Sequence, residues 1–187
     1  MNLIIDDNFA TPEQIKEIHD AFLDVPKDVN KGPWNYWVFL PYTSSPELHK
    51  GAVADDGHIE EDMLLVSPVD EGSHHYNKTK ELLQTFADKH NITVRQLIRT
   101  KVNLYFKSEN QSYHTPHIDF NAPHWVFLYF INDSDGETVF FEDKGTKATF
   151  AIEPKAGRAV VFDGSIYHAS QSPKHSKIRS TLNINFV

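Results

Sequence analysis

The second half of the chain alternates short apolar runs with turns, a pattern typical of β-strands. We predict strands over residues 98–106, 113–120, 125–131, 137–142, 147–152, 158–163 and 179–186. The segments between them are rich in Gly, Pro, Asn and Asp, which favour turns. Many short strands with regular turns indicate a sandwich or a barrel.

Two helices are predicted before these strands. Thr11 and Gln14 stand at the spacing of a capping box, with Pro12 in the first turn, and apolar residues follow at helical spacing. These signals predict a helix over residues 12–23. A second apolar stripe predicts a helix over residues 77–90. We expect the two helices to form a layer that supports the strands.

Residues 26–76 carry many prolines and glycines, which break any long element. The segment also holds an aromatic cluster, made up of Trp34, Tyr36, Trp37, Phe39 and Tyr42. Aromatic side chains mostly pack in cores because they bury a large area, but long irregular segments are often functional. Two interpretations therefore stay open: core packing, or a substrate-facing wall or lid in which Trp37 and Tyr36 contact the substrate.

Polar and apolar residues alternate along three of the predicted strands. The polar positions are Lys101, Asn103, Tyr105 and Lys107 in the first, Tyr113, Thr115, His117, Asp119 and Asn121 in the second, and Arg179, Thr181, Asn183 and Asn185 in the last. Such alternation usually means that one face of the sheet lies in water. Solvent faces are rich in Lys and Glu, whereas these hold mostly His, Asp, Arg, Thr, Asn and Tyr. Because such side chains suit a pocket for a small polar molecule, we predict that the three faces line one barrel mouth.

One pair of residues on these faces suggests a metal site. His117 and Asp119 are two residues apart, so on a strand their side chains point to the same face. His168 follows after several predicted strands, on a loop that would return over the mouth. Two histidines and one carboxylate leave coordination positions open, which suits non-haem Fe(II). The sequence therefore predicts a metal site at His117, Asp119 and His168.

Composition narrows the class of protein. At 187 residues, with 40% hydrophobic and 24% charged residues, the chain has the size and content of a single globular domain. A formal net charge of −8 argues against nucleic acid as the main partner. The absence of cysteine excludes disulfides and thiolate metal sites. With no apolar run long enough for a membrane span and no signal peptide pattern, we predict a cytoplasmic protein.

The motifs together resemble the 2-oxoglutarate/Fe(II)-dependent dioxygenase superfamily, and within it the prolyl 4-hydroxylase-like branch. The matching residues are Tyr105, His117-Ile118-Asp119, Ile131-Asn132-Asp133, Gly136 to Phe140, Pro154, Gly157 to Phe162, His168 and Arg179-Ser180-Thr181. The resemblance covers residues 98–187 well and residues 1–25 weakly. It implies a mainly β (α+β) domain over residues 1–187. In that domain, residues 98–187 form a double-stranded β-helix (jelly roll), and residues 1–97 supply the flanking helices and the aromatic segment.

The resemblance also implies cofactors and residue roles. It implies Fe(II), 2-oxoglutarate as cosubstrate, and O2, with hydroxylation of a substrate and release of succinate and CO2. Arginine suits the distal carboxylate of 2-oxoglutarate because its guanidinium offers a bidentate fork. The implied iron ligands are His117, Asp119 and His168, and the implied 2-oxoglutarate contacts are Arg179, Thr181, Tyr105 and Asn103.

The substrate is less closely defined. The branch suggests a prolyl residue in a peptide or protein. The alternatives are a free amino acid or another small molecule, or a non-oxygenase cupin-like jelly roll that binds a metal or ligand. Nucleic-acid demethylases of the same superfamily share the Asn103-x-Tyr105 pattern, but they carry a second arginine where this chain has Asn185. The branch often has a tyrosine where this chain has Phe130, and Tyr129 would face the other side of the sheet.

Overall fold

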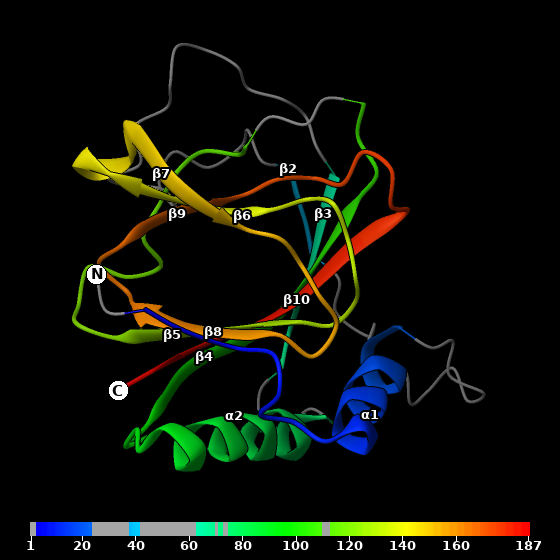
Figure 1. Cartoon of the computed structure of the whole chain (residues 1–187), viewed down its shortest axis with the longest axis vertical. Helices are drawn as coiled ribbons and strands as arrows, with labels where there is room; N and C mark the ends of the chain where they lie inside the picture. Colours follow the sequence, from blue (N-terminus) through cyan, green and yellow to red (C-terminus); the bar gives the residue numbers. More distant parts are fainter. Residues whose placement is uncertain (1–2, 24–37, 42–62, 70, 73–74, 110–112) are drawn as a thin grey trace.

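Two β-sheets face each other, and two helices cover the outer face of the larger sheet (Figure 1). The structure is a computed structural model that describes residues 3–23, 38–41, 63–69, 71–72, 75–109 and 113–187. In chain order its elements are β1 (Leu3–Asp6), α1 (Pro12–Leu23), β2 (Val38–Pro41), β3 (Met63–Pro68), α2 (Tyr76–His90), β4 (Leu97–Phe106), β5 (Trp125–Phe130), β6 (Thr138–Glu142), the 3-10 turn η2 (Asp143–Gly145), β7 (Lys147–Ile152), β8 (Ala159–Asp163), β9 (Tyr167–Ser170) and β10 (Ile178–Phe186). None of the described helices is long and apolar enough to cross a membrane.

The larger sheet has seven strands in the order β1-β8-β5-β10-β4-β3-β2, and the smaller sheet has three in the order β7-β6-β9. Every strand pair among the described residues is antiparallel. Neighbouring strands such as β5 and β10 are distant in sequence, so the chain crosses repeatedly between the sheets. This arrangement is the predicted jelly roll, flanked by the two predicted helices.

The outer face of the larger sheet forms an apolar core with the helices. Phe127 from β5 and Phe86 from α2 meet edge to face with ring centroids 5.4 Å apart, and Phe9 packs against Phe86 at 5.2 Å. Leu182 and Ile184 from β10 are fully buried in the same cluster. The even-numbered positions of β10 are therefore the ones that hold the sheet to the helices.

The inner face of the larger sheet looks toward the smaller sheet and is partly polar. One part of it is an apolar cluster, made up of Val126, Leu128, Phe130, Phe140, Ile152, Val160 and Phe162. The other part is the odd-numbered side of β10, where Arg179, Thr181, Asn183 and Asn185 are each no more than 5% exposed. The predicted polar face of this strand exists, and it lies inside the molecule rather than in water.

Three details differ from the sequence expectations. Residues 113–120 do not form a continuous strand; only Tyr113 and His117 form isolated bridges, because Pro116 and the turn after Asp119 interrupt the ladder. His168 lies within strand β9, not on a loop. The irregular segment 26–76 contains β2 and β3, which extend the larger sheet. Tyr36 and Trp37, the predicted substrate contacts, lie outside the described residues.

Candidate active site

A backbone bridge brings the two predicted histidine ligands together. The amide of His117 donates to the carbonyl of His168 at 3.0 Å, and the amide of His168 donates back at 3.0 Å. Such a pair places two side chains on the same face of the ladder. Their rings are 4.8 Å apart between centroids, and Asp119 follows two residues after His117. The ligand atoms of His117, Asp119 and His168 all lie within 4.8 Å of one another, a group that could hold a metal ion.

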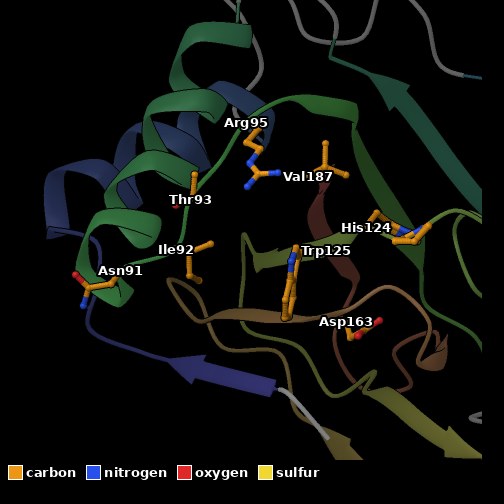
Figure 2. A pocket seen from close by; sticks show the side chains of 9 residues that line it. Asn91, Ile92, Thr93, Arg95, His124, Trp125, Asp163 and Val187 are labelled. Atoms are coloured by element: carbon orange, nitrogen blue, oxygen red, sulfur yellow. The ribbon is translucent and has the colours of Figure 1, made fainter.

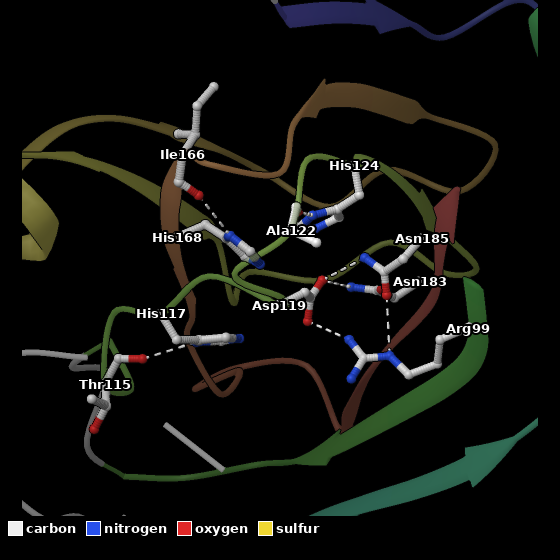
Figure 3. Close-up of polar contacts among 10 residues, drawn as sticks. All are labelled: Arg99, Thr115, His117, Asp119, Ala122, His124, Ile166, His168, Asn183 and Asn185. Carbon is white, nitrogen blue, oxygen red and sulfur yellow. Dashed lines mark hydrogen bonds and ion pairs between the residues drawn. The ribbon is translucent and has the colours of Figure 1, made fainter. Parts of the chain in front are cut away.

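Both imidazoles are oriented by backbone carbonyls (Figure 3). The Nδ1 atom of His117 lies 3.1 Å from the carbonyl oxygen of Thr115, and Nδ1 of His168 lies 3.1 Å from that of Ile166. A carbonyl only accepts, so each Nδ1 carries the proton, and each Nε2 keeps its lone pair for a ligand. Metal-bound histidines are typically held in this way by a partner at the other ring nitrogen.

The protonation states also favour metal binding. Burial, together with the neighbouring His168, lowers the pKa of His117 to about 3. Burial lowers the pKa of His168 as well. For Asp119, burial would raise the pKa, but the charges of Lys101, His168 and Arg99 outweigh it and hold the pKa well below its usual value. Near neutral pH the site thus offers two neutral imidazoles and one carboxylate, the forms that a divalent cation requires.

Donors from β4 and β10 fix the Asp119 carboxylate (Figure 3). Arg99 forms an ion pair with its Oδ1 atom. The amides of Asn185 and Asn183 donate to Oδ2 at 2.8 and 3.3 Å, and the Nε of Arg99 donates to Oδ1 of Asn185 at 3.1 Å. Because each carboxylate oxygen has two lone pairs, these bonds orient Asp119 and leave it able to bind a metal.

Arg179 lies at the start of β10, and aromatic rings and hydroxyl groups surround its side chain. Its guanidinium donates to Oγ1 of Thr138 at 2.6 Å. The guanidinium carbon lies 4.9 Å from the ring centroid of Tyr105 and 5.8 Å from that of Phe130. The Tyr105 hydroxyl is 2.9 Å from the hydroxyl of Ser170. A fully buried guanidinium beside hydroxyl donors is the arrangement expected for binding a carboxylate.

The residues between Arg179 and the histidines fit a small polar ligand. Thr181 is paired with Asn103 across β10 and β4, and both are buried. The Oδ1 atoms of Asn103 and Asn183 are buried and have no hydrogen-bond partner among the described residues. Since an unpaired buried polar atom is costly, these two amides suit a space that a polar ligand fills. The residues present therefore fit both Fe(II) and 2-oxoglutarate.

The structure brings together the residues predicted for both sites, with some additions. Sequence reasoning missed three of these contacts. Thr138 binds Arg179, Ser170 binds Tyr105, and Arg99 binds Asp119. Thr138 lies in the Gly136 to Phe140 motif that carries part of the family resemblance. Its place in that motif is the signal that could have assigned it to the site. Tyr129 faces the helices with Phe9, on the opposite side of the sheet from Arg179, as its parity predicted.

A hollow lies at the end of the larger sheet where β10 finishes, and its wall holds none of the predicted ligands. It has a volume of about 590 Å³ and lies between the end of α2 and the start of β5 (Figure 2). Its wall includes Arg95, Trp125 and His124. The Nδ1 of His124 lies 2.8 Å from the carbonyl oxygen of Ala122, so this ring is oriented by its own turn.

Comparisons with known proteins agree with this geometry. Residues 100–187 match the family model of the 2OG-Fe(II) oxygenase superfamily. A search of curated proteins found no match. Among solved structures, the chain is similar to an oxidoreductase of the 2OG-Fe(II) oxygenase family from Burkholderia pseudomallei, with a TM-score of 0.66 and 12% identity over 98% of this chain and 84% of that one.

Two prolyl hydroxylase structures are also similar. The first is a prolyl-4-hydroxylase from Pseudomonas putida, with a TM-score of 0.58 and 13% identity over 98% of this chain and 91% of that one. The second is a prolyl hydroxylase from Trichoplax adhaerens in complex with a hypoxia inducible factor peptide fragment, with a TM-score of 0.65 and 15% identity over 98% of this chain and 82% of that one. At these identities the likeness concerns the fold.

The family match covers the part of the chain that holds the His-Asp-His group and Arg179. The fold around that part is the jelly roll that oxygenases of this family share with the chain. The family implies Fe(II), 2-oxoglutarate and O2, and the donors present at the site fit them. The family that residues 100–187 match is thus the 2OG-Fe(II) oxygenase superfamily, and the chain shares the fold of solved oxygenases.

Proposed function

We propose that this protein is a 2-oxoglutarate-dependent hydroxylase in which His117, Asp119 and His168 hold Fe(II). The observation that carries the proposal is the juxtaposition of these three ligand atoms, within 4.8 Å of one another, with the buried Arg179 on the same inner face. When bound, Fe(II) with 2-oxoglutarate and O2 supplies the oxidising chemistry, which converts 2-oxoglutarate to succinate and CO2 and hydroxylates a substrate.

The chain's own residues bind and orient the reactants. Arg179 and Thr138 bind the distal carboxylate of 2-oxoglutarate, and Thr181, Tyr105 and Asn103 line the space beside it. Arg99, Asn183 and Asn185 use three of the four lone pairs of the Asp119 carboxylate and leave one on Oδ1 for the metal. The apolar wall of the inner face, including Phe140 and Phe162 near His168, limits the access of water.

For the substrate, we propose a prolyl residue in a peptide or protein. The support is the likeness of the fold to two solved prolyl hydroxylases, one of which is bound to a peptide. A free amino acid is the second candidate, because its α-carboxylate is one of the anions that suit Lys101 on the inner face.

The test is a succinate-release assay with Fe(II), 2-oxoglutarate and O2 across proline-containing peptides and free amino acids. We expect one class to raise succinate formation above the substrate-free rate and to yield a hydroxylated product by mass spectrometry. His168→Ala should abolish both signals. The matched control is His19→Ala, because His19 is exposed on α1, far from the site in the fold. Succinate formation that persists in His168→Ala would contradict the proposal.

A further inference from the structure

A lysine on the inner face of the larger sheet lowers the pKa of Asp119, but it binds no group in the site described so far. Lys101 lies on β4 between Arg99, which binds Asp119, and Asn103, which lines the cosubstrate space. Alternate residues of a strand share a face, so Lys101 points to the same interior as these two. Lys101 is also opposite Asn183 on β10, and Asn183 donates to the Asp119 carboxylate, so Lys101 lies at the metal end of this face.

The ammonium group lacks a partner within the described part of the chain. Among the described residues, no carboxylate lies within ion-pair distance of Lys101, and no hydrogen bond reaches its side chain. The side chain is only partly exposed, and burial lowers the pKa of the ammonium group to about 8. Lysine is seldom buried without a partner because a desolvated charge is costly. The position therefore suits an anion that arrives with a ligand.

The strand register places Lys101 beyond the residues proposed to contact 2-oxoglutarate. Across β10 and β4, Arg179 is opposite Tyr105, Thr181 is opposite Asn103, and Asn183 is opposite Lys101. Each step is two residues, or about 6.8 Å of strand. The cosubstrate has four carbon–carbon bonds of about 1.5 Å, so its carbon chain spans about 6 Å at most. With its distal carboxylate on Arg179, it passes the level of Thr181 and Asn103, and its 2-oxo acid end is taken up by the metal, so neither of its two carboxylates is left for Lys101.

We propose that Lys101 binds a carboxylate of the substrate and holds it beside the metal site. The inference rests on the proposed function and narrows its substrate class to molecules that carry a carboxylate close to the oxidised carbon. Two sources share this chemistry: the α-carboxylate of a free amino acid, and the side chain of an Asp or Glu next to a prolyl residue in a peptide. Arg99 strengthens the local positive potential, and its side chain is 35% exposed on the same face.

The first experiment compares each carboxylate compound with its carboxamide in the succinate-release assay. One arm uses free amino acids and their amides; the other uses proline peptides with Glu or Gln beside the proline. In the wild type we expect the acid to have a KM about 10-fold lower or more, as for a hydrogen bond to a charged group. In Lys101→Met this preference should fall below about twofold. The arm that shows the preference identifies the source of the carboxylate.

The matched control is Lys107→Met, because Lys107 follows β4 directly but its side chain is 51% exposed. This control should keep the wild-type preference for the acid. Equal KM values for acid and amide in the wild type, or an unchanged preference in Lys101→Met, would overturn the proposal.

A second readout does not depend on turnover. In the Zn(II)- and 2-oxoglutarate-loaded wild-type protein, titration with acetate should produce a saturable shift of the Lys101 side-chain ¹⁵N signal and none at Lys107. The absence of a saturable shift would overturn the proposal even if Lys101→Met failed to fold. The affinity for 2-oxoglutarate is measured on the same sample: if 2-oxoglutarate fails to bind, the proposed function fails, whereas normal binding without the acetate shift removes only the role of Lys101.

Discussion

The two faces of β10 are both buried, yet they differ in chemistry. The even positions, such as Leu182 and Ile184, pack against the helices in a continuous apolar core. The odd positions, from Arg179 to Asn185, are just as inaccessible but hold amides, a hydroxyl and a guanidinium. A buried polar face costs free energy unless its groups are paired. The difference indicates that the outer face stabilises the fold and that the inner face is kept for binding.

The largest expected effect is a loss of folding stability when the outer face is substituted. Phe86 is fully buried and contacts Phe9 and Phe127, so Phe86→Ala should lower the free energy of unfolding by about 3–5 kcal/mol. Urea unfolding of the metal-free protein measures it. Ile98→Ala is the control, since Ile98 is 41% exposed, and its effect should stay within about 0.5 kcal/mol. A loss below about 1 kcal/mol in Phe86→Ala would show that this face is not the main core.

At the inner face, substitution should affect binding more than stability. Asn185→Ala removes one donor to Asp119 and the acceptor for Arg99, so the affinity for a divalent metal should fall about 10-fold. A competition titration with Zn(II) and a chromophoric chelator measures it, with the exposed Asn77→Ala as the control. Metal affinity equal to that of the control would mean that Asn185 does not position Asp119 for the metal.

The smallest effect is expected at an edge of the larger sheet, outside both faces. Arg158 donates to Asp7 at 2.6 and 2.9 Å, and these bonds lower the pKa of the Asp7 carboxyl from 3.8 to about 2. A lowered folded pKa contributes stability above pH 3.8 that is lost as the pH falls through 2. The loss should be at most about 1 kcal/mol, because the pair is partly exposed.

Acid unfolding followed by circular dichroism tests this contribution. Asp7→Asn should be less stable than the wild type at pH 5, and the difference between the two should shrink as the pH falls toward 2. A difference that stays constant over this range would contradict the assigned pKa shift.

The sequence predicted much of this difference between faces. Alternation along β10 and β4 separated the polar positions from the apolar ones, and it placed Arg179 and Thr181 on the inner side. The His-x-Asp pair and the distal His168 predicted a cluster that the structure brings together, because side chains two apart share a face even where only isolated bridges form. Strand parity is a local property, so a sequence can reveal it.

Features that depend on distant pairing were not predictable in the same way. β9 has only four residues, and its pairing with β6 across the smaller sheet defines it more than its own pattern does. Arg99 comes two residues before Lys101, the first polar position predicted in this strand, and nothing local showed that it would meet Asp119. Likewise, the contact of Thr138 with Arg179 joins β6 to β10 and arises only when the two sheets face each other.

The central claim is that Arg179 and the His-Asp-His group bind one cosubstrate together on the inner face. The direct test is an anaerobic titration of the Fe(II)-loaded protein with 2-oxoglutarate, followed by the weak visible absorption band of the chelate. We predict a saturable band in the wild type and in the control Arg95→Ala, whose side chain is exposed, and a dissociation constant at least about 10-fold higher in Arg179→Ala. No band in the wild type, or equal affinity in Arg179→Ala, would contradict the claim.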